Sequence, residues 1–83
     1  MAVALITGCS SGFGEAIVVA FAARVDTVVA SMRRCEDASA ALRSTRGVSC
    51  LALDVTDALQ RREVIAAVVA RHGRLDILVS NAG

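Results

Sequence analysis

Short apolar segments alternate with longer segments of helical periodicity along the whole chain, and no other feature limits the possible folds as much. The apolar segments are rich in Val, Ile and Leu, as buried parallel strands are, and cover residues 3–6, 27–30, 49–53 and 75–79. Helical patterns cover residues 15–24, 37–46 and a third segment after Thr56. This order predicts an α/β fold with a doubly wound parallel sheet of four strands, right-handed crossovers and three helices on both faces.

The third helix has the clearest ends. Thr56 is the predicted N-cap, with Asp57 in the first turn. Arg71 and His72 suit the negative end of the helix dipole, and Gly73 follows them in the position where helices often adopt a left-handed residue. We therefore expect this helix to begin beside Thr56 and to end at Gly73.

Composition excludes several classes of protein. At 83 residues the chain is at most one domain; hydrophobic residues make up 55% and the formal net charge is +1, so we expect a packed core and no nucleic-acid partner. The three cysteines, Cys9, Cys35 and Cys50, are an odd number without metal-ligand spacing. They favour a reducing compartment and a passive role over a disulfide or zinc site.

The sequence gives no indication of a membrane or secretory role. No apolar run approaches the roughly 18 residues of a membrane span, and residues 1–6 leave no room for a signal peptide before the first glycine. We expect a cytoplasmic protein without a membrane partner.

The segment TGCSSGFG, residues 7–14, lies between the first strand and the first helix. Gly8 can form the tight turn off the strand, Gly12 lets the backbone approach a bulky anion, and Gly14 lets the helix pack closely on the sheet. Glu15 begins a helix whose free N–H groups would face that anion. The alternative is a glycine turn chosen for packing alone. A Walker loop is excluded because no lysine follows the last glycine.

Three ordered motifs resemble those of the short-chain dehydrogenase/reductase family: Thr7-Gly8-x-x-x-Gly12-x-Gly14, Leu53-Asp54-Val55-Thr56-Asp57 and Ser80-Asn81-Ala82-Gly83. The resemblance implies that residues 1–83 are the N-terminal part of one Rossmann domain that binds a nicotinamide dinucleotide. It assigns cofactor contacts to Gly8, Ser10, Ser11, Gly12, Phe13, Gly14, Arg33, Arg34, Asp54, Val55, Asn81, Ala82 and Gly83.

The chain departs from the family pattern in two places. Ser80 replaces the first asparagine of an Asn-Asn-Ala-Gly motif, which affects a hydrogen-bond network of the sheet. Val25 stands where the turn after the first helix usually has glycine. A β-branched residue in a left-handed conformation would be strained, so we expect a turn that is less stable or differently shaped.

The residues after the second strand favour NADP over NAD. An NAD enzyme typically ends this strand with an acid that binds the ribose hydroxyls, whereas here no carboxylate occurs before Glu36. A guanidinium matches phosphate oxygens, so Arg33, helped by Arg34 or by Ser10 and Ser11, would read the 2′-phosphate. The alternative is two solvated arginines. The missing acid also argues against a methyltransferase of similar topology.

Two further positions have a functional and a structural interpretation. The resemblance places the Asp54 carboxylate beside the adenine amino group, while the alternative is a residue that begins a loop and caps the following helix. Asn81 is most often structural in this family, and the backbone of residues 81–83 would line the adenosine side of the cleft. We expect Asp76 to orient the start of the fourth strand.

The chain contains no tyrosine and no lysine, so no catalytic residue can be named in it. The family uses Tyr-x-x-x-Lys and a serine to reduce a carbonyl or oxidise an alcohol, and we expect these residues, the small-molecule substrate and a homo-oligomer only in the complete protein. Residues 1–83 alone are predicted to be inactive and marginally stable. The alternatives are a non-catalytic NAD(P)-binding regulatory or sensor protein and an interaction fragment that pairs through its open strand edge.

Overall fold

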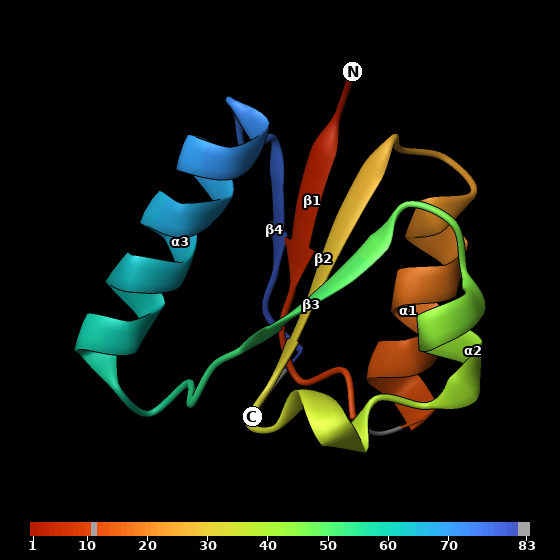
Figure 1. Ribbon diagram of the computed structural model, residues 1–83, viewed down its shortest axis with the longest axis horizontal. Coiled ribbons are helices and arrows are strands. Elements are labelled where there is room, and N and C mark those ends of the chain that lie inside the picture. Colours follow the sequence, from red (N-terminus) through yellow and green to blue (C-terminus); the bar gives the residue numbers. More distant parts are fainter. Residues whose placement is uncertain (11, 82–83) are drawn as a thin grey trace.

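The computed structural model describes residues 1–10 and 12–81, and these residues form a parallel sheet between two helical layers (Figure 1). The strands are β1 (Val3–Ile6), β2 (Thr27–Met32), β3 (Val48–Ala52) and β4 (Ile77–Val79), in the order β3-β2-β1-β4. Helices α1 (Gly12–Ala22) and α2 (Ala40–Ser44) cover one face, and α3 (Ala58–His72) covers the other. The predicted fold, with its parallel sheet and crossovers on both faces, is confirmed.

The core has two halves, one on each face of the sheet. Side chains of β2 alternate between them, because successive residues of a strand point to opposite faces. One half gathers Ile6, Cys9, Val18, Val28, Ala30, Met32 and Leu42 beneath α1 and α2. The other gathers Val3, Leu5, Val29, Leu53, Val64 and Val68 beneath α3. β1 lies between two strands and is buried along its whole length, which explains its uninterrupted apolar sequence.

Helix α1 begins three residues before the predicted start at Glu15. It runs from Gly12 to Ala22, so two glycines occupy its first turn. Glycine weakens a helix interior, but the first N–H groups of a helix have no partner inside it, so the early start loses little hydrogen bonding. The loop before the helix is therefore shorter than the glycine pattern suggested.

The predicted helix over residues 37–46 is wrong as a single element. A 3₁₀ turn, η1 (Cys35–Asp37), is followed by extended Ala38 and then by the short helix α2. The Ser39 side chain accepts a hydrogen bond from the Leu42 N–H at 3.2 Å and so caps α2. A capping serine competes with helix continuation, which accounts for the interruption.

Helix α3 is capped by Asp57 and not by Thr56 as predicted. The Asp57 carboxylate accepts hydrogen bonds from the N–H groups of Leu59 at 3.0 Å and Gln60 at 3.1 Å. The Thr56 hydroxyl donates instead to the Asp54 carboxylate at 2.7 Å, so it is committed to the preceding loop. The predicted end is confirmed, because Gly73 has a φ of 81° and its N–H donates to the Val69 carbonyl.

The turn between α1 and β2 avoids the strain expected at Val25. The described residues include no non-glycine residue with positive φ. The N–H groups of Arg24 and Val25 both donate to the Phe21 carbonyl, at 2.8 and 2.9 Å, and Val25 packs against the α1 face of the core. The turn is thus differently shaped, as the sequence indicated, and its valine adds apolar contact.

Asp76 ties the start of β4 to the first strand, as predicted. Its carboxylate accepts a hydrogen bond from the Val3 N–H at 2.8 Å and pairs with Arg74 at 2.7 Å. These two interactions, with the Arg74 hydrogen bond the larger, lower the pKa of Asp76.

β4 is an edge of the sheet formed by the described residues, and Leu78 is 54% exposed there. Among the helices of residues 1–10 and 12–81, none combines the length and apolar character needed to cross a membrane.

Candidate cofactor-binding site

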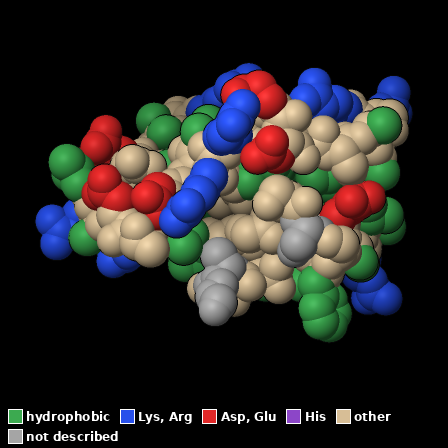
Figure 2. Space-filling model, turned by 90° about the horizontal axis from the view of Figure 1, so that it is seen from below, with side chains coloured by type: hydrophobic (Ala, Val, Ile, Leu, Met, Phe, Trp, Pro, Cys, Tyr) green, Lys and Arg blue, Asp and Glu red, His purple; other side chains and the backbone are tan. Residues whose placement is uncertain are grey.

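The candidate site lies at the carboxyl edge of the sheet, where the loops after all four strands meet. Because the strands are parallel, these loops gather at the lower edge in Figure 1. Figure 2 views this edge from below and shows Arg, Asp and Glu side chains around a central surface of backbone and small side chains. Ligands of doubly wound sheets bind at such an edge.

The loop after β1 is held between its two neighbouring strands. Gly8 has a φ of 68°, in the left-handed region that glycine adopts without strain. On one side the Thr7 N–H donates to the Val79 carbonyl at 3.0 Å, and on the other the Cys9 N–H donates to the Ser31 carbonyl at 3.1 Å. The tight turn predicted at Gly8 is therefore present and anchored to both β4 and β2.

The Cys9 side chain faces the core and not the site. It is 1% exposed, and its thiol donates to the Ile6 carbonyl at 3.0 Å. Burial raises the pKa of this thiol to about 11, and a backbone hydrogen bond from Ser31 opposes that shift. A protonated, buried thiol is a poor nucleophile, in agreement with the passive role expected for this residue.

Gly14 is the point where α1 touches the loop. A Cβ at this position would overlap the Gly8 carbonyl oxygen and lie 2.8 Å from the Cys9 Cα and 2.9 Å from the Asn81 Nδ2. A Cβ at Gly12, by contrast, would meet nothing within 4 Å. The two glycines thus have different surroundings: Gly14 permits close packing of the helix, and the backbone at Gly12 lies open to an approaching ligand.

Asn81 fastens the loop after β4 to the glycine turn. Its side-chain amide donates to the Gly8 carbonyl at 3.1 Å, and its backbone N–H donates to the Thr7 hydroxyl at 3.1 Å. Thr7 in turn donates to the Val79 carbonyl at 3.4 Å. Thr7 belongs to the glycine motif, but the sequence predicted no side-chain contact for it. Its position directly after a buried strand is the sequence feature that could have indicated this role.

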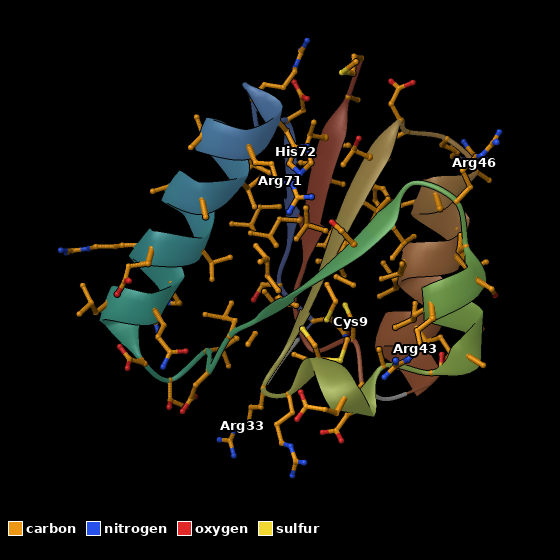
Figure 3. All side chains as sticks on the ribbon, in the orientation of Figure 1. Cys9, Arg33, Arg43, Arg46, Arg71 and His72 are labelled. Carbon is orange, nitrogen blue, oxygen red and sulfur yellow. The ribbon has the colours of Figure 1, made fainter. Side chains whose placement is uncertain are left out.

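The loop after β2 carries the two arginines. Arg33 extends from the lower edge of the molecule in Figure 3, with its side chain 74% exposed. Its guanidinium lies 3.9 Å from the Asp54 carboxylate, whereas Arg34 pairs with Glu36 at 3.5 Å. Exposed ion pairs of this kind contribute at most about 1 kcal/mol, so either guanidinium is available to another anion.

Asp54 has a structural role in the loop after β3. Its Oδ1 accepts hydrogen bonds from the Thr56 hydroxyl at 2.7 Å and the Thr56 N–H at 3.0 Å. These bonds are the main cause of a lowered Asp54 pKa, to which the nearby Arg33 charge adds. The carboxylate is 39% exposed and stays ionised at neutral pH. The loop interpretation is thus present in the geometry, although Asp57 and not Asp54 caps the helix.

The other predicted contacts are spread over the same edge. Ser10 and Phe13 are exposed, and Phe13, in the first turn of α1, is 81% exposed. Val55 is half-buried and packs against the α3 half of the core, while its carbonyl accepts a hydrogen bond from Arg61. The predicted contacts at Ser11, Ala82 and Gly83 lie outside the described residues.

Known proteins are similar to this chain both in sequence and in the arrangement of strands and helices. The family model for short chain dehydrogenases matches residues 2–83. Over 98% of this chain, the 3-oxoacyl-acyl-carrier-protein reductase of Thermotoga maritima is 40% identical, and the D-threitol dehydrogenase of Mycolicibacterium smegmatis is 42% identical. The chain spans only about a third of their length, 35% and 33% respectively.

A solved structure gives the same result for the fold. A metagenomic short-chain oxidoreductase in complex with NADP superposes with a TM-score of 0.91 at 32% identity, covering 99% of this chain and 39% of its own. The relatives are reductases and dehydrogenases, and the family binds a nicotinamide dinucleotide. On the family match and on the arrangement of the strands and glycine loop, this chain belongs to the short chain dehydrogenase family.

Proposed function

We propose that residues 1–83 form the adenosine-binding part of the Rossmann domain of an NADP-preferring oxidoreductase. The complete protein would reduce a carbonyl or oxidise an alcohol. The nicotinamide of the bound cofactor supplies or accepts the hydride in that reaction. The residues of this chain bind and orient the other end of the cofactor, and none of them acts on the substrate.

The end of β2 is the observation that carries the NADP preference. Ser31 and Met32, the last two residues of the strand, are 0% and 3% exposed, and the Ser31 hydroxyl donates to the Ile6 carbonyl at 3.3 Å. Arg33 is the next residue, and its side chain is exposed. The first side chain that can reach a ligand at this strand end is therefore cationic, where an NAD enzyme would place a carboxylate.

A phosphate would readily displace Asp54 as the partner of Arg33. Its 3.9 Å separation from Asp54 is longer than a hydrogen bond, and both side chains are exposed to solvent. A charge-assisted hydrogen bond to a phosphate oxygen is worth roughly 1.5–3 kcal/mol, against at most about 1 kcal/mol for the exposed pair. The balance favours the phosphate, and the dianionic 2′-phosphate gives NADPH an advantage that NADH lacks.

The glycine loop fits the pyrophosphate for a separate reason. The backbone at Gly12 is open, and it begins an 11-residue helix whose unpaired N–H groups and dipole favour an anion. Gly14 and Asn81 keep the turn at Gly8 in place beside that helix start. We infer that these backbone donors bind the pyrophosphate without any charged side chain in residues 7–14.

The free oxygen of Asp54 supports a contact with the adenine. Both hydrogen bonds from Thr56 fall on Oδ1, and the ion pair with Arg33 is measured to the same atom. We infer that Oδ2 accepts the hydrogen bond of the adenine amino group. An ionised carboxylate suits this role, and the lowered pKa of Asp54 keeps it ionised at neutral pH.

The proposal is tested by cofactor titration of the full-length protein. Intrinsic NADPH and NADH fluorescence, followed with thermal unfolding, should show tighter binding of NADPH. Arg33→Ala should weaken NADPH binding about tenfold or more, from the loss of roughly 1.5 kcal/mol, and should leave NADH binding within about twofold. Arg46→Ala is the matched control, because Arg46 is exposed at the opposite end of the molecule in Figure 3.

The two parts of the proposal fail in different ways. Equal binding of NADPH and NADH that Arg33→Ala does not change would refute the NADP preference but leave the dinucleotide site intact. Failure of both cofactors to bind or to stabilise the full-length protein would refute the oxidoreductase assignment. If Arg46→Ala weakened NADPH binding as much as Arg33→Ala does, the loss would come from the net charge of the protein and not from a specific contact between Arg33 and the 2′-phosphate.

A further inference from the structure

Cys35 and Cys50 lie in direct contact although the sequence separates them by 15 positions. The Cys50 thiol donates a hydrogen bond to the Cys35 Sγ, with 2.6 Å between the two sulfur atoms. Cys35 begins the η1 turn after β2, and Cys50 lies in β3 opposite Ala30 of β2. Both thiols are free and half-buried. The contact therefore joins the η1 turn to β3, an edge strand of the sheet.

The backbone around the pair is fixed by Arg43. Its Nε donates to the Ala38 carbonyl at 3.0 Å, and its Nη2 donates to the Glu36 carbonyl at 3.1 Å and the Cys35 carbonyl at 3.4 Å. Figure 3 shows Arg43 beside this turn, on the side of the sheet that α1 and α2 cover. Three bonds from one guanidinium hold the η1 turn in place, so the approach of the sulfur atoms is built into the fold.

A small molecule can reach the Cys50 side of the pair. A cavity of about 220 Å³ lies between the sheet and α2, and it is lined on its sides by Met32, Leu42, Arg43 and Cys50. Its volume far exceeds that of hydrogen peroxide, since a water molecule occupies about 30 Å³ in the liquid. The Cys50 sulfur thus has a partner sulfur 2.6 Å away and a path for an oxidant.

We propose that Cys35 and Cys50 are a redox-active pair that hydrogen peroxide oxidises to a disulfide. A disulfide has a sulfur–sulfur distance of about 2.05 Å, so bond formation requires the two atoms to move together by only about half an ångström. A disulfide in a reducing compartment is usually transient and regulatory, and Cys35 lies directly after the two arginines of the candidate cofactor site.

The oxidation takes two steps. One of the two thiols, as its thiolate, attacks peroxide, forms a sulfur–oxygen bond and breaks the oxygen–oxygen bond, releasing hydroxide. The other thiol then attacks the resulting sulfenic acid and loses its proton as water leaves. Two thiols and one peroxide give one disulfide and two waters.

Peptide mapping of the full-length protein tests the proposal. After peroxide treatment and alkylation, trypsin releases Cys35 in residues 35–43 and Cys50 in residues 47–61, because arginine precedes and ends both peptides. We expect these two peptides to be recovered linked, and to separate on reduction. Cys9, in the peptide that ends at Arg24, is the internal control and should be alkylated only after unfolding, because it is buried.

Two variants identify the thiol that attacks peroxide. Cys50→Ser and Cys35→Ser each leave one thiol of the pair, and dimedone should trap a sulfenic acid on that thiol in at least one of the two variants. Absence of a dimedone adduct from both variants would overturn the proposal. Independent oxidation of Cys35 and Cys50 to sulfinic acids in the native protein, or full alkylation of both after peroxide, would overturn the pair itself.

Discussion

Replacing Gly14 with alanine tests how the glycine loop and α1 are held together. The added methyl group would overlap the Gly8 carbonyl oxygen and press on the Cys9 Cα at 2.8 Å. Both are backbone atoms of a turn that hydrogen bonds fix to β2 and β4, so neither can rotate away as a flexible side chain would. The third contact, the Asn81 Nδ2 at 2.9 Å, can move only by giving up its bond to Gly8.

The expected cost follows from these contacts. Forcing an extra methyl group into a packed site costs about 1–3 kcal/mol, and the rigid backbone neighbours place Gly14→Ala near the upper end. Loss of the Asn81 hydrogen bond adds about 1 kcal/mol, while the better helix propensity of alanine returns about 1 kcal/mol. We expect Gly14→Ala to reduce the free energy of unfolding by about 2–3 kcal/mol.

Gly12→Ala is the matched control, because it makes the same substitution two residues earlier in the same helix turn. A Cβ there meets nothing within 4 Å, so the unfolding free energy should change by less than about 1 kcal/mol. Urea unfolding of the full-length variants, monitored by circular dichroism, measures both values. Equal destabilisation by the two substitutions, or a Gly14→Ala variant as stable as the parent, would refute the close-packing argument.

Two further predictions concern the ends of α3 and β4. Asp57→Ala should lower the free energy of unfolding by about 1 kcal/mol in urea titrations, because it removes the acceptor of the Leu59 and Gln60 N–H groups, whereas Thr56→Ala should cost less. Asp76 has a lowered pKa, so its ionised form stabilises the fold above the ordinary value of 3.8, and that contribution is lost as the pH falls through the lower folded value. Stability should therefore decline below about pH 4, and less steeply in Asp76→Asn; an unchanged slope in that variant would contradict the assignment.

The arrangement of the sheet could be predicted from sequence because each strand is short, apolar and separated from the next by a helical pattern. β1 shows why: it is buried on both faces, so its residues need no polar alternation and give an unambiguous apolar run. The same rule predicted an end of β2 at residue 30 that is too early, because buried Ser31 and Met32 extend the strand beyond its apolar residues. Ser31 is tolerated there because its hydroxyl finds the Ile6 carbonyl.

The helix boundaries were less predictable because several polar residues compete to form them. Thr56 and Asp57 are both good N-cap residues, and the choice depends on Asp54, which takes the Thr56 hydroxyl as its own donor. Ser39 likewise caps a new helix in the middle of a segment whose alanine content indicated a continuous one. In both places a single side-chain hydrogen bond decides the boundary.

In the candidate site and its surroundings, features set by neighbouring residues could be predicted, and contacts between distant residues could not. The glycine spacing and the strand-end arginine are local features, and they lie where the sequence placed them. The contact between Cys35 and Cys50 depends on how β3 and the η1 turn lie beside each other, which no spacing rule for cysteine reveals. The odd number of cysteines predicts passive thiols, and that count carries no information on which of them lie in contact.

The bonds of Asn81 connect the cofactor edge to the exposed edge of the sheet. Through Thr7 and Gly8, the loop after β4 holds the same glycine turn that packs under α1. β4 itself has a neighbour on one side only among the described strands, with Leu78 exposed. Anything that covers or pairs with β4 would therefore stabilise the glycine turn, and anything that frays β4 would loosen it. Cofactor affinity should consequently depend on the integrity of this strand as much as on the residues that would touch the cofactor.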